Sequence, residues 1–335
     1  WDSQWDWQGS VPYDDLPWTR DPAEGLIVTA NQEVSAAGPF LTSEWDAGYR
    51  AQRIRALLSA RATITPVDMA SIQLDNVDPF AKTLVGALLT VDLKGDSFTA
   101  AARDLLVNWD GSTPADSSPN SAAAAYFNAV WATLLSNTFD DQLPRDLWAD
   151  GGSRWRLAVT NLLGDPANSW WDDKRTPGAV ENRDEILHRA LVDARLELTR
   201  SLGPNVENWS WGKLHTLTLA HRVFGTDGTP GWVQSIFDRG PIPLPGGSSI
   251  VDANGWNAAK GYAVNWAPSM RMVVDLGSLD SSTWVNQTGQ SGHAYNPHYV
   301  DQVDAWASGG SFPWPFSSGA VAAAKVDELT LTPKG

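Results

Sequence analysis

The sequence predicts an α+β fold, in which a large helical region at about residues 48–225 lies between strand-rich segments at 1–47 and 240–335. In the middle of the chain, apolar residues such as Ile54 and Leu58 recur at helical spacing. After residue 240, glycine-rich turns alternate with short β-prone runs. No internal repeat or low-complexity linker divides the chain, so we expect one α+β domain rather than two autonomous ones.

The individual helices follow from capping and stop signals. Thr65, Pro66 and Asp68 are typical of a helix start, as N-cap, first-position proline and first-turn acid. Further helices are predicted at residues 80–93, 97–108, 121–136, 154–163 and 180–202. The last should end at Gly203-Pro204, because glycine favours the helix C-terminus and proline cannot continue the helix.

Strands are expected on both sides of the helical region. In the first segment, which is rich in Trp, Pro, Asp and Gly, the strand candidate is at residues 26–28. In the last segment, strands are predicted at 270–274 and 282–285, followed by a short helix at 299–306 and a final strand at 329–331.

The composition of the 335-residue chain limits its function. A net charge of −15 repels nucleic acid and anionic membranes, so we expect neither as a partner. The apolar runs are far shorter than the roughly 20 residues of a membrane span, which predicts a soluble protein. The absence of cysteine excludes thiolate catalysis and disulfides. Most of the 19 tryptophans are expected in the core, with an aromatic-lined ligand pocket as the alternative.

One local group of residues has the composition of a serine-hydrolase triad. Ser291 lies in Gly289-Gln290-Ser291-Gly292 and is followed by His293, His298 and Asp301. A nucleophile elbow requires glycine where His293 stands, and triad members usually come from distant parts of a chain. We therefore predict a turn here, with a hydrogen-bonded His298 and a surface Asp301 rather than a metal site.

Seven short blocks occur in a fixed order along the chain. They are WDWQG at 5–9, DPAEGLIVTAN at 21–31, WDAGYRAQRI at 45–54, NWSWGKLH at 208–215, SMRMVVD at 269–275, TGQSG at 288–292 and PHYVDQ at 297–302. In this order the blocks resemble the penicillin acylase family, which includes penicillin, cephalosporin, lipopeptide and acyl-homoserine-lactone acylases.

The resemblance implies that residues 1–335 are the C-terminal portion of an acylase large (beta) subunit. Family members are precursors that cleave themselves, and the large subunit then begins with the nucleophilic serine. Its own α-amino group, with a pKa of about 7.7–8.0, serves as base. The expected fold is a portion of the αββα sandwich of N-terminal-nucleophile hydrolases, and the expected reaction is deacylation of penicillin-like, acyl-homoserine-lactone or lipopeptide amides. The nucleophile would lie upstream of Trp1, so this chain alone lacks it.

The resemblance also assigns two site residues in this chain. Asn31 matches the oxyanion-hole asparagine, whose amide N–H groups stabilise the tetrahedral intermediate. Arg50 matches an arginine near the nucleophile that orients it and the asparagine. No cofactor is required. Many members bind a structural calcium through an acid before the WDAGYR block, but residues 34–43 carry none, which argues against calcium from this chain.

The expected partners are the acylase small (alpha) subunit, the N-terminal part of the large subunit and a small-molecule amide. Severed from them, the chain should expose apolar surface and aggregate. The family resemblance implies a periplasmic or secreted protein. Two alternatives are a Trp-rich binding module without chemistry and an inactive family relative.

Overall fold

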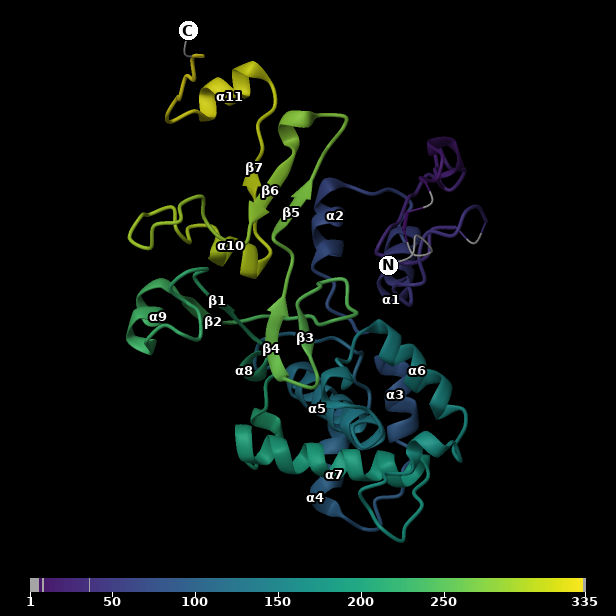
Figure 1. Ribbon diagram of the computed structural model, residues 1–335. Helices are drawn as coiled ribbons and strands as arrows, with labels where there is room; N and C mark the ends of the chain where they lie inside the picture. Colours follow the sequence, from purple (N-terminus) through teal and green to yellow (C-terminus); the bar gives the residue numbers. More distant parts are fainter. Residues whose placement is uncertain (1–5, 8, 36, 334–335) are drawn as a thin grey trace.

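The computed structural model describes residues 6–7, 9–35 and 37–333 (Figure 1). Trp5 and Gln8 of the first sequence block, and Ala36 of the stretch considered for calcium, lie outside the described residues. The helices are α1 (Tyr49–Ser59), α2 (Pro66–Gln73), α3 (Ala81–Leu88), α4 (Ser97–Arg103), α5 (Pro119–Phe139), α6 (Ser153–Leu163), α7 (Arg183–Leu202), α8 (Trp211–Leu214), α9 (Gly231–Phe237), α10 (Val303–Ser308) and α11 (Ser318–Ala324). The strands are β1 (Thr216–Leu219), β2 (Arg239–Pro243), β3 (Gly255–Asn257), β4 (Gly261–Trp266), β5 (Met270–Val273), β6 (Thr283–Asn286) and β7 (Phe312–Pro313).

The α+β class predicted from the sequence is confirmed, and the central helices lie close to their predicted bounds. Thr65 forms a full capping box with Asp68 at the start of α2. Helix α7 has a second capping box and ends at Leu202, where Gly203 takes a φ of +98°. The predicted helix at 80–93 is shorter than expected, because the chain turns after Leu88.

The main core surrounds α5, which packs along α7 (Figure 1). Helix α5 is buried on all sides between Ser121 and Trp131, as expected of a helix without a polar face. The Tyr126 hydroxyl donates to the Leu191 carbonyl at 2.9 Å and so ties α5 to α7. Five tryptophans are almost fully buried, which confirms the core role for these five: Trp131, Trp171, Trp209, Trp211 and Trp306.

The strands form three small antiparallel sheets: β1–β2, β3–β4 and β5–β6–β7. Figure 1 shows β5, β6 and β7 extending away from α5 and α7, with α2 beside β5 and α11 at the far end. A second, smaller core lies among the sheets and α10, made of Leu217, Leu244, Val264, Val285 and Trp306. Among the described residues, no helix is both long and apolar enough to cross a membrane.

Two predicted strands are wrong. Residues 26–28 have no regular secondary structure, Ile27 is 62% exposed, and the nearest bridge is an isolated parallel one between Gln32 and Asp46. Residues 329–331 are likewise unpaired, with Leu329 and Leu331 both 84% exposed. A strand requires a neighbour to accept and donate its backbone hydrogen bonds, and the described chain provides none at either place.

Candidate functional site

The structure brings Asn31 and Arg50 together, although 18 residues separate them in the sequence. Asn31 has a φ of +66°, a left-handed conformation that asparagine tolerates better than most residues. Its Oδ1 accepts a hydrogen bond from Arg50 Nη2 at 2.8 Å, and the same nitrogen donates to the Ala30 carbonyl at 3.0 Å. A guanidinium has only donors, so it fixes which end of the Asn31 amide faces it. The side chain of Asn31, which is exposed, therefore directs its NH₂ group away from Arg50.

Arg50 reaches this position because α1 begins at a sharp turn. Gly48 precedes the helix with a φ of +88°, and its N–H donates to Asp46 Oδ1 at 2.8 Å. The other carboxylate oxygen of Asp46 lies 3.5 Å from Arg50 Nη2. Both side chains of this ion pair are largely buried, with 18% and 12% exposed for Arg50 and Asp46. The carboxylate thus partly neutralises the guanidinium and holds it beside Asn31.

Two residues of the site were missed in the sequence analysis. Besides its contact with Arg50, Asp46 donates its backbone N–H to the Asn31 carbonyl at 2.8 Å. Gln32 braces the chain on the other side: its Oε1 accepts from the Ala30 N–H at 2.7 Å and its Nε2 donates to the Val28 carbonyl at 3.0 Å. The role of Asp46 could have been predicted from its place four residues before Arg50. Nothing in the local sequence indicates a role for Gln32.

A cleft of about 1100 Å³ lies next to the site; Gln32, Asp46 and Gly48 line it, whereas Asn31 and Arg50 do not. Its wall includes the segment at residues 26–29, Trp18 and Trp45, and polar side chains such as Glu24 and, from α1, Gln52 and Arg55. The cleft therefore combines apolar and polar side chains with backbone groups that belong to no strand. Such a surface suits a second extended segment of polypeptide.

The group around Ser291 is a series of turns and bends, as predicted. The Ser291 hydroxyl accepts a hydrogen bond from the His293 backbone N–H at 3.1 Å. His298 Nδ1 contacts Asp301 Oδ2 at 2.8 Å, and both side chains are exposed. Among the residues that the structure describes, no hydrogen bond joins the Ser291 hydroxyl to either imidazole. The arrangement stabilises a surface loop, and Gly289 is required where it packs against the His298 carbonyl.

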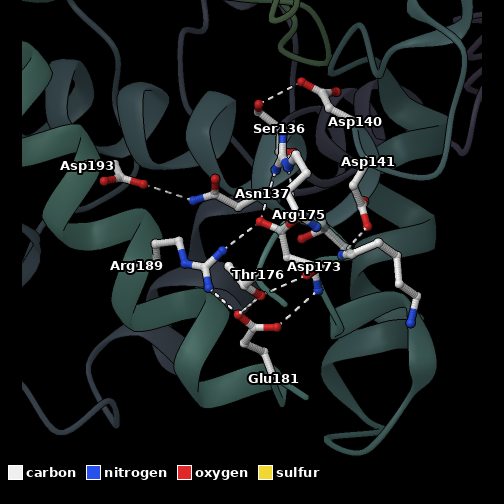
Figure 2. Close-up of polar contacts among 12 residues, drawn as sticks. Ser136, Asn137, Asp140, Asp141, Asp173, Arg175, Thr176, Glu181, Arg189 and Asp193 are labelled. Carbon is white, nitrogen blue, oxygen red and sulfur yellow. Dashed lines mark hydrogen bonds and ion pairs between the residues drawn. The ribbon is translucent and has the colours of Figure 1, made fainter. Parts of the chain in front are cut away.

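A charged cluster joins α7, the loop before it and the end of α5 (Figure 2). Asp173 accepts from Arg175 and from Arg189, at 2.8 and 2.7 Å, and Glu181 accepts from Thr176 and Arg189. Asp173 and Glu181 each face a guanidinium, so these ion pairs close the loop onto α7. In the described part of the chain, no three His, Asp or Glu side chains form a metal-binding group.

Two buried groups with strongly shifted pKa values lie outside the Asn31 region. Burial lowers the pKa of His215 to about 4; the ring stacks on Trp211, with 4.5 Å between ring centroids. Burial raises the pKa of Asp252 to about 6, although the Arg271 guanidinium at 3.0 Å opposes the rise. Neither group contacts Asn31 or Arg50, so both belong to the packing of the sheets on the helical region.

Comparison with known proteins shows a consistent set of relatives. The sequence matches the penicillin amidase family over residues 1–323. The acyl-homoserine lactone acylase QuiP of Pseudomonas aeruginosa is 30% identical, covering 99% of this chain and 42% of that protein. The penicillin acylase 2 proenzyme of Pseudomonas sp. strain SE83 is 29% identical, with the same two coverages.

A solved structure shares the fold. The thermostable penicillin G acylase from Alcaligenes faecalis aligns with a TM-score of 0.60 at 16% identity, covering 98% of this chain and 61% of that one. The present chain thus spans 42% of the length of each of the two curated relatives.

Proposed function

The chain belongs to the penicillin amidase family, and we propose that it is the C-terminal part of the large subunit of an enzyme that hydrolyses amides. The observation that carries the proposal is the contact of Arg50 with Asn31 Oδ1. It leaves the NH₂ group of Asn31 free to donate to a substrate oxygen, which is the requirement for an oxyanion hole. The substrates would be penicillin-like, acyl-homoserine-lactone or lipopeptide amides.

In the proposed reaction, an N-terminal serine from the upstream part of the large subunit attacks the amide carbonyl. Its α-amino group takes the hydroxyl proton, and the carbonyl oxygen becomes an anion to which Asn31 donates. The tetrahedral intermediate collapses to an acyl-enzyme, and the α-amino group returns the proton to the leaving amine. Water then attacks the ester by the same route and releases the acid. Arg50 holds the Asn31 amide throughout, so that no reorientation is needed as charge develops.

The surfaces around the site support multi-chain partners. In the described chain the segment at 26–29 pairs with no strand and lines the cleft, and Leu276, after β5, is 86% exposed. We propose that the small subunit and the N-terminal part of the large subunit cover these surfaces and complete the αββα sandwich. The isolated chain should then aggregate and bind a hydrophobic dye. A periplasmic or secreted location is the corresponding expectation.

A labelling experiment tests the proposal. The full-length protein that contains this chain is treated with a serine-directed sulfonyl fluoride, and the adduct is located by peptide mass spectrometry. We expect it on the N-terminal serine of the mature large subunit. An adduct on Ser291 would instead indicate a self-contained serine hydrolase. Absence of any adduct, together with no release of amine from N-acyl substrates, would favour the binding module or the inactive relative.

A further inference from the structure

Helix α1 carries Arg50 and has a small apolar face. Of its 11 residues, only Ala51 and Leu58 are buried, and at its start the half-buried Tyr49 ring packs against Phe80 of the main core. Helices in proteins obtain most of their stability and position from the burial of an apolar face. With so small a face, the position of α1 depends on its polar side chains as well as on the contact of Tyr49.

We propose that Arg53 is a positioning residue, whose ion pair with Asp75 fixes α1 and, through it, Arg50 and the amide of Asn31. Arg53 Nε donates to Asp75 Oδ1 at 2.9 Å, and Nη2 donates to Oδ2 at 2.7 Å. Two parallel bonds define the orientation as well as the distance of the helix. Both side chains are partly shielded, with 29% and 13% exposed. This role presupposes the proposed function of Asn31.

The spacing along α1 explains how the pair acts on the site. Arg53 lies three residues after Arg50, so the two side chains are neighbours on one face of the helix, about 4.5 Å apart along its axis. A helix is stiff over one turn, so a shift of α1 at Arg53 moves Arg50 by a similar amount. The 2.8 Å contact with Asn31 Oδ1 would be lost after a shift of about 1 Å.

Asp75 is a suitable anchor because its own position is fixed from two sides. Its N–H donates to the Ile72 carbonyl at 3.1 Å, at the end of α2, and its carbonyl accepts from the Asp252 N–H at 2.9 Å. The Asp252 carboxylate is in turn held by Arg271 of β5 at 3.0 Å. The Arg53 ion pair thus connects α1 to both the helical region and the sheets.

The chain supplies a matched control in Arg61. It follows α1 and pairs with Asp68 of α2 at 3.3 Å, with 33% and 31% of the two side chains exposed. The residue types are the same as in the first pair, and the two arginines are similarly exposed, at 33% and 29%. Arg61, however, lies three turns from Arg50, so its loss should not displace the Asn31 contact.

The experiment measures kcat and KM for amide hydrolysis by the full-length protein, normalised to the amount of mature large subunit. Arg53→Gln and Asp75→Asn should each lower kcat by about 10- to 100-fold with KM within about 3-fold, as expected for misplaced catalytic groups. The double variant should be no worse than either single one. Arg61→Gln should stay within about 2-fold of the wild type. Arg53→Lys keeps the charge but cannot form both bonds, and should fall between the wild type and Arg53→Gln.

The kcat values of these variants decide whether Arg53 positions the site or only stabilises the fold. If Arg53→Gln and Arg61→Gln have equal kcat values, Arg53 only stabilises the fold and the positioning role is wrong. If Arg53→Gln does not mature, Arg53→Lys gives the same comparison, and a wild-type kcat for it overturns the role. If the wild type itself hydrolyses no amide, the proposed function fails, and the role of Arg53 fails with it.

Discussion

Replacing Arg50 with methionine in the full-length protein should lower kcat/KM for amide hydrolysis by about 10- to 150-fold. Arg50 Nη2 is 2.8 Å from Asn31 Oδ1, and hydrogen bonds from charged donors contribute about 1.5–3 kcal/mol. Each 1.36 kcal/mol of transition-state stabilisation corresponds to about a tenfold change in rate, which gives the predicted range. Asn31→Ala removes the oxyanion donor itself and should cost about 2.7–4 kcal/mol, or roughly 100- to 1000-fold.

The two substitutions together distinguish a direct from an indirect role of Arg50. If Arg50 acts by holding Asn31, the double variant should be no slower than Asn31→Ala, with a coupling energy of about 1.5–3 kcal/mol. The assay is a double-mutant cycle in kcat/KM, from initial rates on a chromogenic N-acyl anilide. Arg61→Met is the control, since Arg61 follows the same helix, pairs with Asp68 of α2 and lies outside the cleft.

Additive effects would refute this reasoning. A double variant slower than Asn31→Ala by the full Arg50 factor would mean that Arg50 contacts the substrate or the nucleophile directly. A loss of rate in the Arg61 control as large as that of Arg50→Met would mean that the loss of any cation near α1 disturbs the site.

Two further predictions concern stability, measured as Tm of the full-length protein. Arg156→Met should lower Tm by several degrees. The side chain of Asp78 is fully buried and accepts a hydrogen bond from Arg156 Nη1 at 2.5 Å, and the loss of this counter-ion should cost about 3–5 kcal/mol of stability. Adding Asp78→Asn should restore most of the lost Tm, and failure to do so would contradict a charge effect. Burial raises the pKa of Asp252 to about 6 from 3.8, so its carboxyl group binds a proton more tightly in the folded state than in the unfolded state. Protonation of Asp252 therefore favours folding increasingly as the pH falls through about 6 toward 4. His215, whose pKa burial lowers to about 4 from 6.5, opposes folding over the same window. Asp252→Asn should therefore lose Tm more steeply than the wild type between pH 6 and 4, and a parallel pH profile would show that Asp252 has no shifted pKa.

The sequence by itself determined the helical region and the α+β class, because the signals for helices are local. The capping residues at Thr65 and the stop at Gly203 act within a few residues, and they mark helix ends in the structure where the sequence predicts them. Ordered sequence blocks likewise gave the family, since the penicillin amidase match extends over residues 1–323. The turn at Ser291 was predictable from its glycines and from the missing glycine of a nucleophile elbow.

The tertiary structure alone decided which segments pair and which side chains meet. Residues 26–28 and 329–331 have strand propensity, yet they are unpaired, because a strand is stabilised by a neighbour that its own sequence does not specify. The contact of Arg50 with Asn31 depends on the turn at Gly48 and on the carboxylate of Asp46, which together bring α1 back to an extended segment. Sequence spacing fixes neighbours within a helix, but contacts between elements depend on how the whole chain packs.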